Sequence, residues 1–256
     1  MRNFIFFLFF GLVILLNSCN QFNQKHPQAG IGEQSPPLNE ESILRYVDSV
    51  NNNLPHFTKT ESLIYTLDQL SFFVTKYSAG ELPVLYINTG TRGDTVTYVK
   101  KYYLKNKHLV FYEEQQNNSS RPDPFVVSRA YMRNNVIFYS EEKQAATEEE
   151  LKTIQFKRSE ITTHNYADEI TRLENALQQQ GDFNLVFDDI TAYPKARYII
   201  LSRNVVNAYR APVLVEKEDD FIKELSSNKE KYKGRKLQLK WTIRNNEAIY
   251  QSGTLE

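Results

Sequence analysis

The sequence predicts an α+β fold in which an antiparallel β-meander with flanking helices is followed by a small β-rich domain with one helix. Residues 103–114, YLKNKHLVFYEE, and residues 131–142, YMRNNVIFYSEE, align if His108 is treated as a one-residue insertion. Each unit passes from an aromatic segment through a turn of basic residues and Asn into an apolar and then acidic segment, which is typical of a β-hairpin. The 16 Tyr and 16 Phe beside only 9 Gly also favour a β-rich protein.

The N-terminus has the layout of a secretory signal peptide. A short cationic start, Met1-Arg2, precedes a nearly continuous apolar run over residues 4–16, which is too short for a bilayer span of about 20 apolar residues. The run ends at Leu16-Asn17-Ser18-Cys19, which resembles the lipobox of bacterial lipoproteins. The resemblance implies that residues 1–18 are removed, that the Cys19 thiol is diacylglycerated and that the new amino terminus is acylated. The alternative is a buried cysteine in an uncleaved hydrophobic helix.

Lipidation of Cys19 would decide where the protein resides. Several acyl chains on one residue hold a protein at a membrane essentially permanently, so we expect an exported protein whose first partner is the membrane. By resemblance to enterobacterial sorting, Asn20 in place of Asp implies the outer membrane, with its periplasmic and outer faces both open. Cys19 is the single cysteine of the chain, so no intramolecular disulfide can form.

The composition after the anchor changes at residue 40. Residues 19–39 are rich in Asn, Gln, Pro and Gly and predict a flexible tether. Removal of residues 1–18 leaves 256 − 18 = 238 residues, enough for one large domain or two ordinary ones. We predict two, over residues 40–160 and 161–256. Because 31 Lys and Arg balance 31 Asp and Glu, no net field attracts a nucleic acid, and none is predicted as a partner.

The first predicted domain combines helices with the meander. Apolar side chains at helical spacing predict a helix over residues 40–54, and a capping box of Thr147 and Glu150 predicts another that ends near residue 158. The spacing in residues 62–77 suits a helix and strands equally. The predicted strands cover residues 84–89, 95–105, 109–115, 125–133 and 136–143.

This layout resembles a class of secreted lipoproteins, common in the Bacteroidetes, in which units of aromatic strand, basic or Asn turn and apolar strand repeat along one sheet. The resemblance depends on the two repeated units quoted above. It implies an architecture and carries no activity.

The second predicted domain begins with a helix over residues 166–180 that Gly181 ends. A further helix is predicted to start at Asp219 or Asp220. Three strands, a helix and two strands follow the element order of an OB-like barrel, and a different α+β wiring is the alternative. The predicted strands cover residues 183–190, 197–202, 213–216, 237–244 and 248–255.

The chain shows no constellation typical of a metal or cofactor site. The four histidines, His26, His56, His108 and His164, are far apart and have no Cys or carboxylate at metal-ligand spacing. A Gly-rich phosphate loop and a Gly-x-Ser-x-Gly elbow are also missing from the sequence. No cofactor is therefore predicted.

Aromatic residues of the meander and a basic run near the C-terminus form the predicted binding surface. Aromatic side chains on an open sheet face can bind sugars or a protein, and they can equally be core beneath a helix. The basic run, residues 229–236, is diluted by acidic neighbours, which favours a solvated surface over ligand binding. The candidate residues are Tyr98, Tyr102, Tyr112, Tyr139, Lys233, Arg235 and Lys236.

Three functions are compatible with these patterns. The first is a non-enzymatic, lipid-anchored envelope protein that binds a protein or glycan partner. The second is an envelope hydrolase with a site between the two domains, built on the paired carboxylates Asp188 and Asp189 and a third residue that the sequence does not identify. The third is an OB-like module that binds a ligand through residues 195–240.

Overall fold

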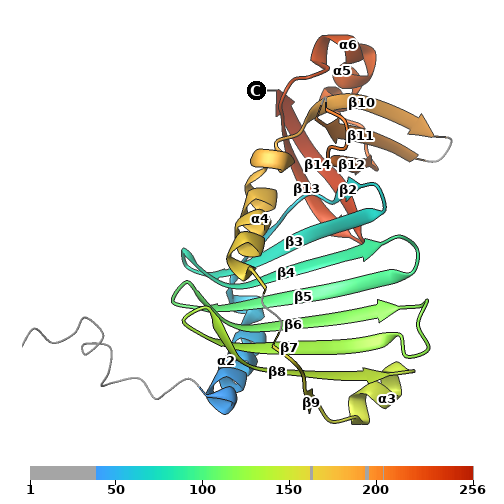
Figure 1. The fold of residues 1–256 in the computed structure, drawn as a ribbon. Coiled ribbons are helices and arrows are strands. Elements are labelled where there is room, and N and C mark those ends of the chain that lie inside the picture. The colour runs from blue at the N-terminus through green and yellow to red at the C-terminus, as the bar shows by residue number, and fades with distance from the viewer. Residues whose placement is uncertain (1–38, 162–163, 194–195, 204, 256) are drawn as a thin grey trace, which may run out of the picture. The chain divides into compact units, whose positions relative to one another are not determined.

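The computed structural model describes residues 39–161, 164–193, 196–203 and 205–255 (Figure 1). The predicted signal peptide, Cys19 and the tether up to residue 38 lie outside the described residues. Residues 40–256 form one compact unit, and the strands within it belong to one large mixed sheet. The predicted β-rich α+β class is therefore confirmed, whereas the division at residue 161 stays a prediction.

The N-terminal part of this unit is built on long antiparallel strands that are neighbours in chain order. The strands from β3 to β8 pair consecutively. Residues 62–77, which suited a helix and strands equally, form β2 and most of β3. The elements are α2 (Glu40–Asn52), the 3-10 helix Leu54–His56, β1 (Thr58–Glu61), β2 (Tyr65–Leu67), β3 (Leu70–Ala79), β4 (Leu82–Arg92), β5 (Val96–Lys105), β6 (His108–Asn118), β7 (Phe125–Arg133), β8 (Val136–Ala145), α3 (Glu148–Thr153) and β9 (Lys157–Arg158).

The two repeated units form the β5–β6 and β7–β8 hairpins. Their turns place two residues each at positive φ, Asn106 and Lys107 in the first and Asn134 and Asn135 in the second. Asn adopts this left-handed conformation more readily than most residues with a side chain, which is why the turn chemistry was visible in the sequence. The helix predicted from the capping box does begin after Thr147, but it ends at Thr153 instead of near residue 158.

Side chains alternate between two faces of the sheet, and each face is covered by a different helix (Figure 1). On one face, here the α4 face, the Tyr102 hydroxyl donates a hydrogen bond to Glu169 of α4 at 2.7 Å. On the opposite face, the α2 face, the Tyr103 hydroxyl donates to the Asn51 side-chain oxygen of α2 at 3.0 Å. Consecutive tyrosines of one strand therefore hold the two helices on opposite sides.

The C-terminal part continues the same sheet through the β12–β2 pair, Arg210 with Thr66. Its strands pair in the order β10-β11-β12 and β12-β14-β13, and the β12–β14 pair is parallel. Buried residues of α4, the C-terminal strands and α5 join the core of the meander in one cluster. The elements are α4 (Tyr166–Gln178), the 3-10 helix Gly181–Phe183, β10 (Val186–Tyr193), β11 (Ala196–Ser202), β12 (Arg210–Val215), α5 (Asp220–Ser227), α6 (Lys229–Tyr232), β13 (Leu237–Arg244) and β14 (Glu247–Leu255).

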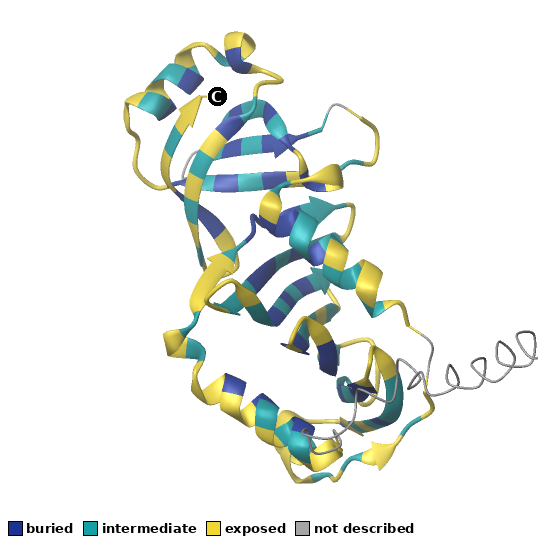
Figure 2. Ribbon diagram, turned by 90° about the vertical axis from the view of Figure 1, so that its left-hand side faces the viewer, coloured by how far each residue is buried: buried dark blue, intermediate teal, exposed yellow. Residues whose placement is uncertain are grey.

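The helices bury narrow apolar faces and leave their other sides exposed (Figure 2). In α2 the buried side chains are Ile43, Val47 and Val50, which recur at helical spacing. In α5 the predicted cap is present, because the Asp219 carboxylate accepts a hydrogen bond from the Ile222 N–H at 2.9 Å. Within the described residues, no helix has the length and apolar character needed to cross a bilayer.

Candidate binding site

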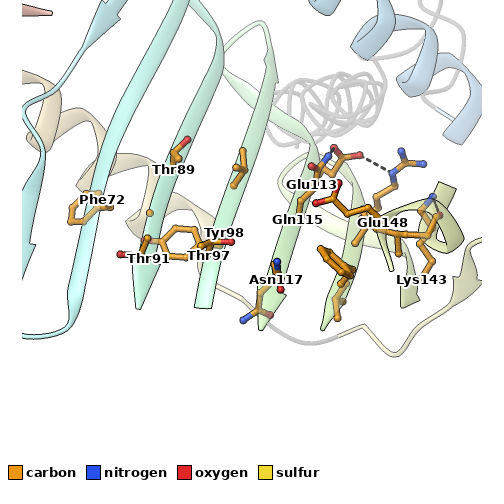
Figure 3. Close-up of a pocket in the computed structure, with 18 of the residues that line it drawn as sticks. Phe72, Thr89, Thr91, Thr97, Tyr98, Glu113, Gln115, Asn117, Lys143 and Glu148 are labelled. Atoms are coloured by element: carbon orange, nitrogen blue, oxygen red, sulfur yellow. Dashed lines mark hydrogen bonds and ion pairs between the residues drawn. The ribbon is translucent and has the colours of Figure 1, made fainter. Parts of the chain in front are cut away.

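A cavity of about 670 Å³, here the sheet cavity, opens on the α2 face of strands β3 to β8 (Figure 3). α2 covers the other end of this face, and α3 and Phe156 supply one wall of the cavity. The volume lies within the range of small-molecule sites, about 300–1,000 Å³. The sheet beneath it is rigid, because each central strand is hydrogen-bonded on both sides.

A row of four neutral polar side chains, here the polar row, crosses the cavity floor. Ser71 of β3 pairs with Thr91 of β4, Thr91 with Thr97 of β5, and Thr97 with Asn117 of β6. The register then places Phe125 of β7 next to Asn117, and all five residues line the cavity. Within the described part of the chain, none of the four polar side chains donates or accepts a hydrogen bond. Their hydrogen-bonding capacity is available to a ligand.

A ladder of alternating charges closes the inner end of the cavity. Neighbouring strands contribute Lys101, Glu113, Arg129 and Glu141, with contacts of 3.5, 2.9 and 3.6 Å between successive charged atoms. Glu113 is one of the residues that line the cavity (Figure 3). Burial favours the neutral form of Glu113, but the cations Lys101 and Arg129 outweigh it and hold the pKa of this carboxyl below its usual 4.5. The ladder is self-neutralising.

The wall beside α3 engages two further cationic groups. The Arg129 guanidinium lies 4.0 Å from the Phe156 ring centroid, and the Lys143 ammonium lies 4.8 Å from it. Lys143 also donates a hydrogen bond to the Leu151 carbonyl at 2.8 Å. These contacts attach the α3 segment to the sheet, so both cations have structural partners before any ligand arrives.

Two of the four tyrosines predicted for binding lie in the core. Tyr102 and Tyr112 are 1% and 7% exposed and pack against Tyr166 of α4. Burial, followed by the nearby Glu169 and Glu114 carboxylates, raises the pKa of Tyr102 and Tyr112 far above the usual 10. These two residues fit the alternative in which the aromatic side chains are core beneath a helix.

The other two predicted tyrosines are half-buried. Tyr98 is among the residues that border the sheet cavity (Figure 3), but it alternates with Thr97 along β5 and shares the α4 face with Tyr102. A Cβ on Gly90 would lie only 2.5 Å from the Tyr98 hydroxyl, so the glycine makes room for the ring. Burial raises the pKa of Tyr98 to about 12. Tyr139 donates a hydrogen bond to Glu141 at 3.3 Å and does not line the cavity.

The paired carboxylates of β10 are engaged by the predicted basic run. Lys233 lies 3.7 Å from Asp188, and Lys229 lies 2.9 Å from Asp189. Slight burial would raise the pKa of Asp189, but the Lys229 contact and the Ile190 N–H lower it below its usual value. The carboxylates do not line the sheet cavity. Their contacts fasten the α6 segment to β10, which is a structural role.

The remaining two basic candidates also contact β10 or the residues just before it. Lys236 donates a hydrogen bond to the Asn184 side-chain oxygen at 2.7 Å. The Arg235 carbonyl accepts one from the Phe187 N–H at 2.9 Å. The seven candidate residues therefore fall in separate places, and Tyr98 is the one that borders the sheet cavity.

The histidines among the described residues do not form a cluster. His164 lies 3.0 Å from Glu169 and packs edge-on against Tyr166, whereas His108 is exposed at the β5–β6 turn. No group of three or more His, Cys, Asp or Glu side chains capable of holding a metal ion occurs among the described residues. His26 lies outside them.

Sequence reasoning missed the polar row because its members come from four different strands. The available signal was a change along each strand, from Leu, Tyr and Phe at the α2 end to Thr, Gln and Asn at the other. Comparison with known proteins adds no assignment. No family model, curated protein or solved structure matches the chain.

Proposed function

We propose that this chain is a non-enzymatic protein of the bacterial cell envelope, anchored through lipid on Cys19, that binds a protein or glycan partner in the sheet cavity. The observation that carries the proposal is the polar row, whose four side chains line an open cavity with their hydrogen-bonding capacity unused. A row of this kind on a rigid sheet is suited to recognition, because the contacts are positioned before the partner binds.

The charges around the cavity support binding over catalysis. Glu113, the buried carboxylate of the lining, is held ionised between Lys101 and Arg129. A general acid or base at neutral pH needs a pKa moved toward 7, and that of Glu113 is moved away from 7. For the hydrolase alternative, Asp188 and Asp189 each contact a lysine, and neither lines this cavity.

Strand wiring favours the OB-like module as a second candidate. The order β10-β11-β12-β14-β13, with a parallel β12–β14 pair and α5 and α6 between β12 and β13, matches a five-stranded Greek-key barrel. Phe187 of β10 exchanges backbone hydrogen bonds with Gly234 and Arg235 just before β13, at 2.8 and 2.9 Å, which supports a barrel-like closure between β10 and β13. In such barrels one face binds oligosaccharides or oligonucleotides.

The anchor and the outer-membrane location are part of the proposal. Their support is the lipobox-like Leu16-Asn17-Ser18-Cys19 and the Asn at position 20. Several acyl chains at Cys19 would keep the protein membrane-bound through an alkaline carbonate wash. The Cys19→Ala variant should be washed off or retained in an unprocessed form with its leader, and a processed variant that stays bound would contradict the anchor.

Site-specific photocrosslinking in intact cells tests the binding role. A photoreactive amino acid replaces Gln115 on the cavity floor, and the matched control carries it at Gln251, an exposed glutamine of β14 outside the cavity and outside residues 195–240. We expect a discrete adduct of higher mass from position 115 that position 251 does not give. Identical adduct patterns from both positions, or none from position 115, would contradict a binding role for the cavity.

A further inference from the structure

We infer that the sheet cavity takes a neutral oligosaccharide chain, which lies across the strands along the polar row. The inference rests on the proposed binding function and narrows the partner from protein or glycan to one ligand class. Its evidence is the chemistry, spacing and charge of the cavity lining.

The hydrogen-bonding groups of the polar row match those of a sugar. Ser71, Thr91 and Thr97 present hydroxyl groups, and Asn117 presents an amide, so every member can both donate and accept. Sugar hydroxyls have the same dual capacity. Gln115 adds a second amide on the neighbouring row of the same floor, where its nitrogen donates to Glu113 at 3.0 Å and its oxygen stays available.

The spacing of the polar row suits a polymer with a short repeat. Its members lie on four successive strands, and neighbouring strands are separated by about 4.8 Å. That step is close to the length of one pyranose unit in an extended chain, so successive sugar units would meet successive side chains. A chain crossing β3 to β6 along the row ends beside the ring of Phe125.

The aromatic end of the row supplies the apolar contact that sugar binding needs. Phe125 is half-buried and lines the cavity next to Asn117. A pyranose ring carries polar hydroxyls at its edge and apolar C–H groups on its face, and an aromatic ring can cover such a face. An amide beside an aromatic ring therefore addresses both surfaces of one sugar unit.

The charges of the cavity favour a neutral ligand over an anionic one. Arg129 is engaged by Glu113, Glu141 and Phe156, and Lys143 by Phe156 and the Leu151 carbonyl. An anionic sugar would have to break these contacts to gain a cationic partner. On the rim, the charge of Lys152 on α3 is offset by Glu148 in the same helix.

The cavity floor is less suited to an extended peptide. Peptides that add to a sheet use the free backbone groups of an edge strand. Strands β4 to β7 beneath the cavity are interior, each paired on both sides, so their backbone groups are already bonded. Only side chains of the floor are therefore available for hydrogen bonds to a ligand, and in the polar row these are hydroxyl groups and an amide.

The test uses the full lipidated chain in mild detergent on an array of neutral and anionic glycans, followed by calorimetry with the strongest neutral oligosaccharide. The Thr97→Val/Asn117→Ala variant removes two members of the polar row. The control, Thr242→Val/Gln251→Ala, makes matching changes at exposed positions of β13 and β14 that lie outside the cavity and outside residues 195–240. Among the described residues, none of the replaced side chains takes part in a hydrogen bond, and thermal midpoints of the three proteins verify that the fold is retained.

We expect binding confined to neutral glycans, an affinity lowered about tenfold or more in the Thr97→Val/Asn117→Ala variant, and an unchanged affinity in the control. Binding to anionic glycans alone, no binding, or an undiminished affinity in the variant would overturn the inference. If the array is blank while position 115 captures a protein in cells, the glycan inference fails and the proposed binding function stands. If both experiments are negative, both fail.

Discussion

Replacement of Glu113 by Gln should destabilise the fold by removing the central anion of the charge ladder. The Glu113 side chain is 10% exposed and contacts Arg129 at 2.9 Å and Lys101 at 3.5 Å, whose side chains are 25% and 27% exposed. Breaking a fully buried pair costs about 3–5 kcal/mol, and an exposed pair is worth about 0–1 kcal/mol. For this intermediate burial we expect a loss of about 2 kcal/mol, or about 4–8 °C in the midpoint of thermal unfolding.

The pH dependence of this loss follows from the lowered pKa of Glu113. A carboxyl whose pKa is lower in the folded than in the unfolded state stabilises the fold above its unfolded value, here 4.5, and loses that contribution as the pH falls through the folded value. The difference between wild-type and Glu113→Gln proteins should therefore be full at pH 7 and shrink as the pH falls below 4.5.

Urea unfolding of the full chain in mild detergent, followed by circular dichroism at pH 7 and at pH 3, measures both quantities. Glu81→Gln, at an exposed turn position, is the matched control and should change the free energy of unfolding by less than about 0.5 kcal/mol. A loss below about 0.5 kcal/mol at pH 7 for Glu113→Gln, or an equal loss at the two pH values, would refute the reasoning.

Three further outcomes are expected. Tyr102→Phe removes the 2.7 Å hydrogen bond to Glu169 and should lower the free energy of unfolding by about 1–2 kcal/mol, measured by urea titration; an unchanged midpoint would mean that this bond does not hold α4 to the sheet. Gly90→Ala places a Cβ 2.5 Å from a backbone carbonyl oxygen of β3 and should lower the free energy of unfolding by about 1–3 kcal/mol. Gly80→Asn, at φ +61 in open space, is the control and should lower it by less than about 1 kcal/mol. Equal thermal midpoints of the two variants would contradict close packing at Gly90. Cys19→Ala should abolish metabolic labelling with a radioactive fatty acid, and labelling that persists would exclude Cys19 as the acylated residue.

The hairpin turns, two helix caps and the first helix could be predicted from the sequence. The Asn turns of the two hairpins, the Thr147 and Asp219 caps and the apolar spacing of residues 40–54 each depend on residues within a few positions of one another, and the structure has these features. The segment 62–77 stayed ambiguous, because apolar and β-branched residues there satisfy both periods, and pairing with β4 decides in favour of strands.

Which residues come together in the site is decided by the pairing register of strands that are far apart in the sequence. Local sequence patterns do not reveal this register. Whether Tyr102 is core or surface depends on α4, which begins more than 60 residues later and covers it. Ser71 and Asn117 share one row only because three strand pairs align them. The sequence favoured a solvated surface for the basic run. In the structure, Lys229 and Lys233 contact the carboxylates of β10, which lie 40 or more residues earlier in the chain.

The most direct test of the account is to fill the sheet cavity and measure capture of the partner in cells. Thr97→Trp places a large ring on the exposed floor between Thr91 and Asn117, and Thr242→Trp adds the same ring at an exposed position of β13. With the photoreactive residue at position 115 in both, we expect the adduct to disappear in the first variant and to persist in the second. An adduct of undiminished yield from a folded Thr97→Trp protein would contradict the claim that the partner occupies this cavity.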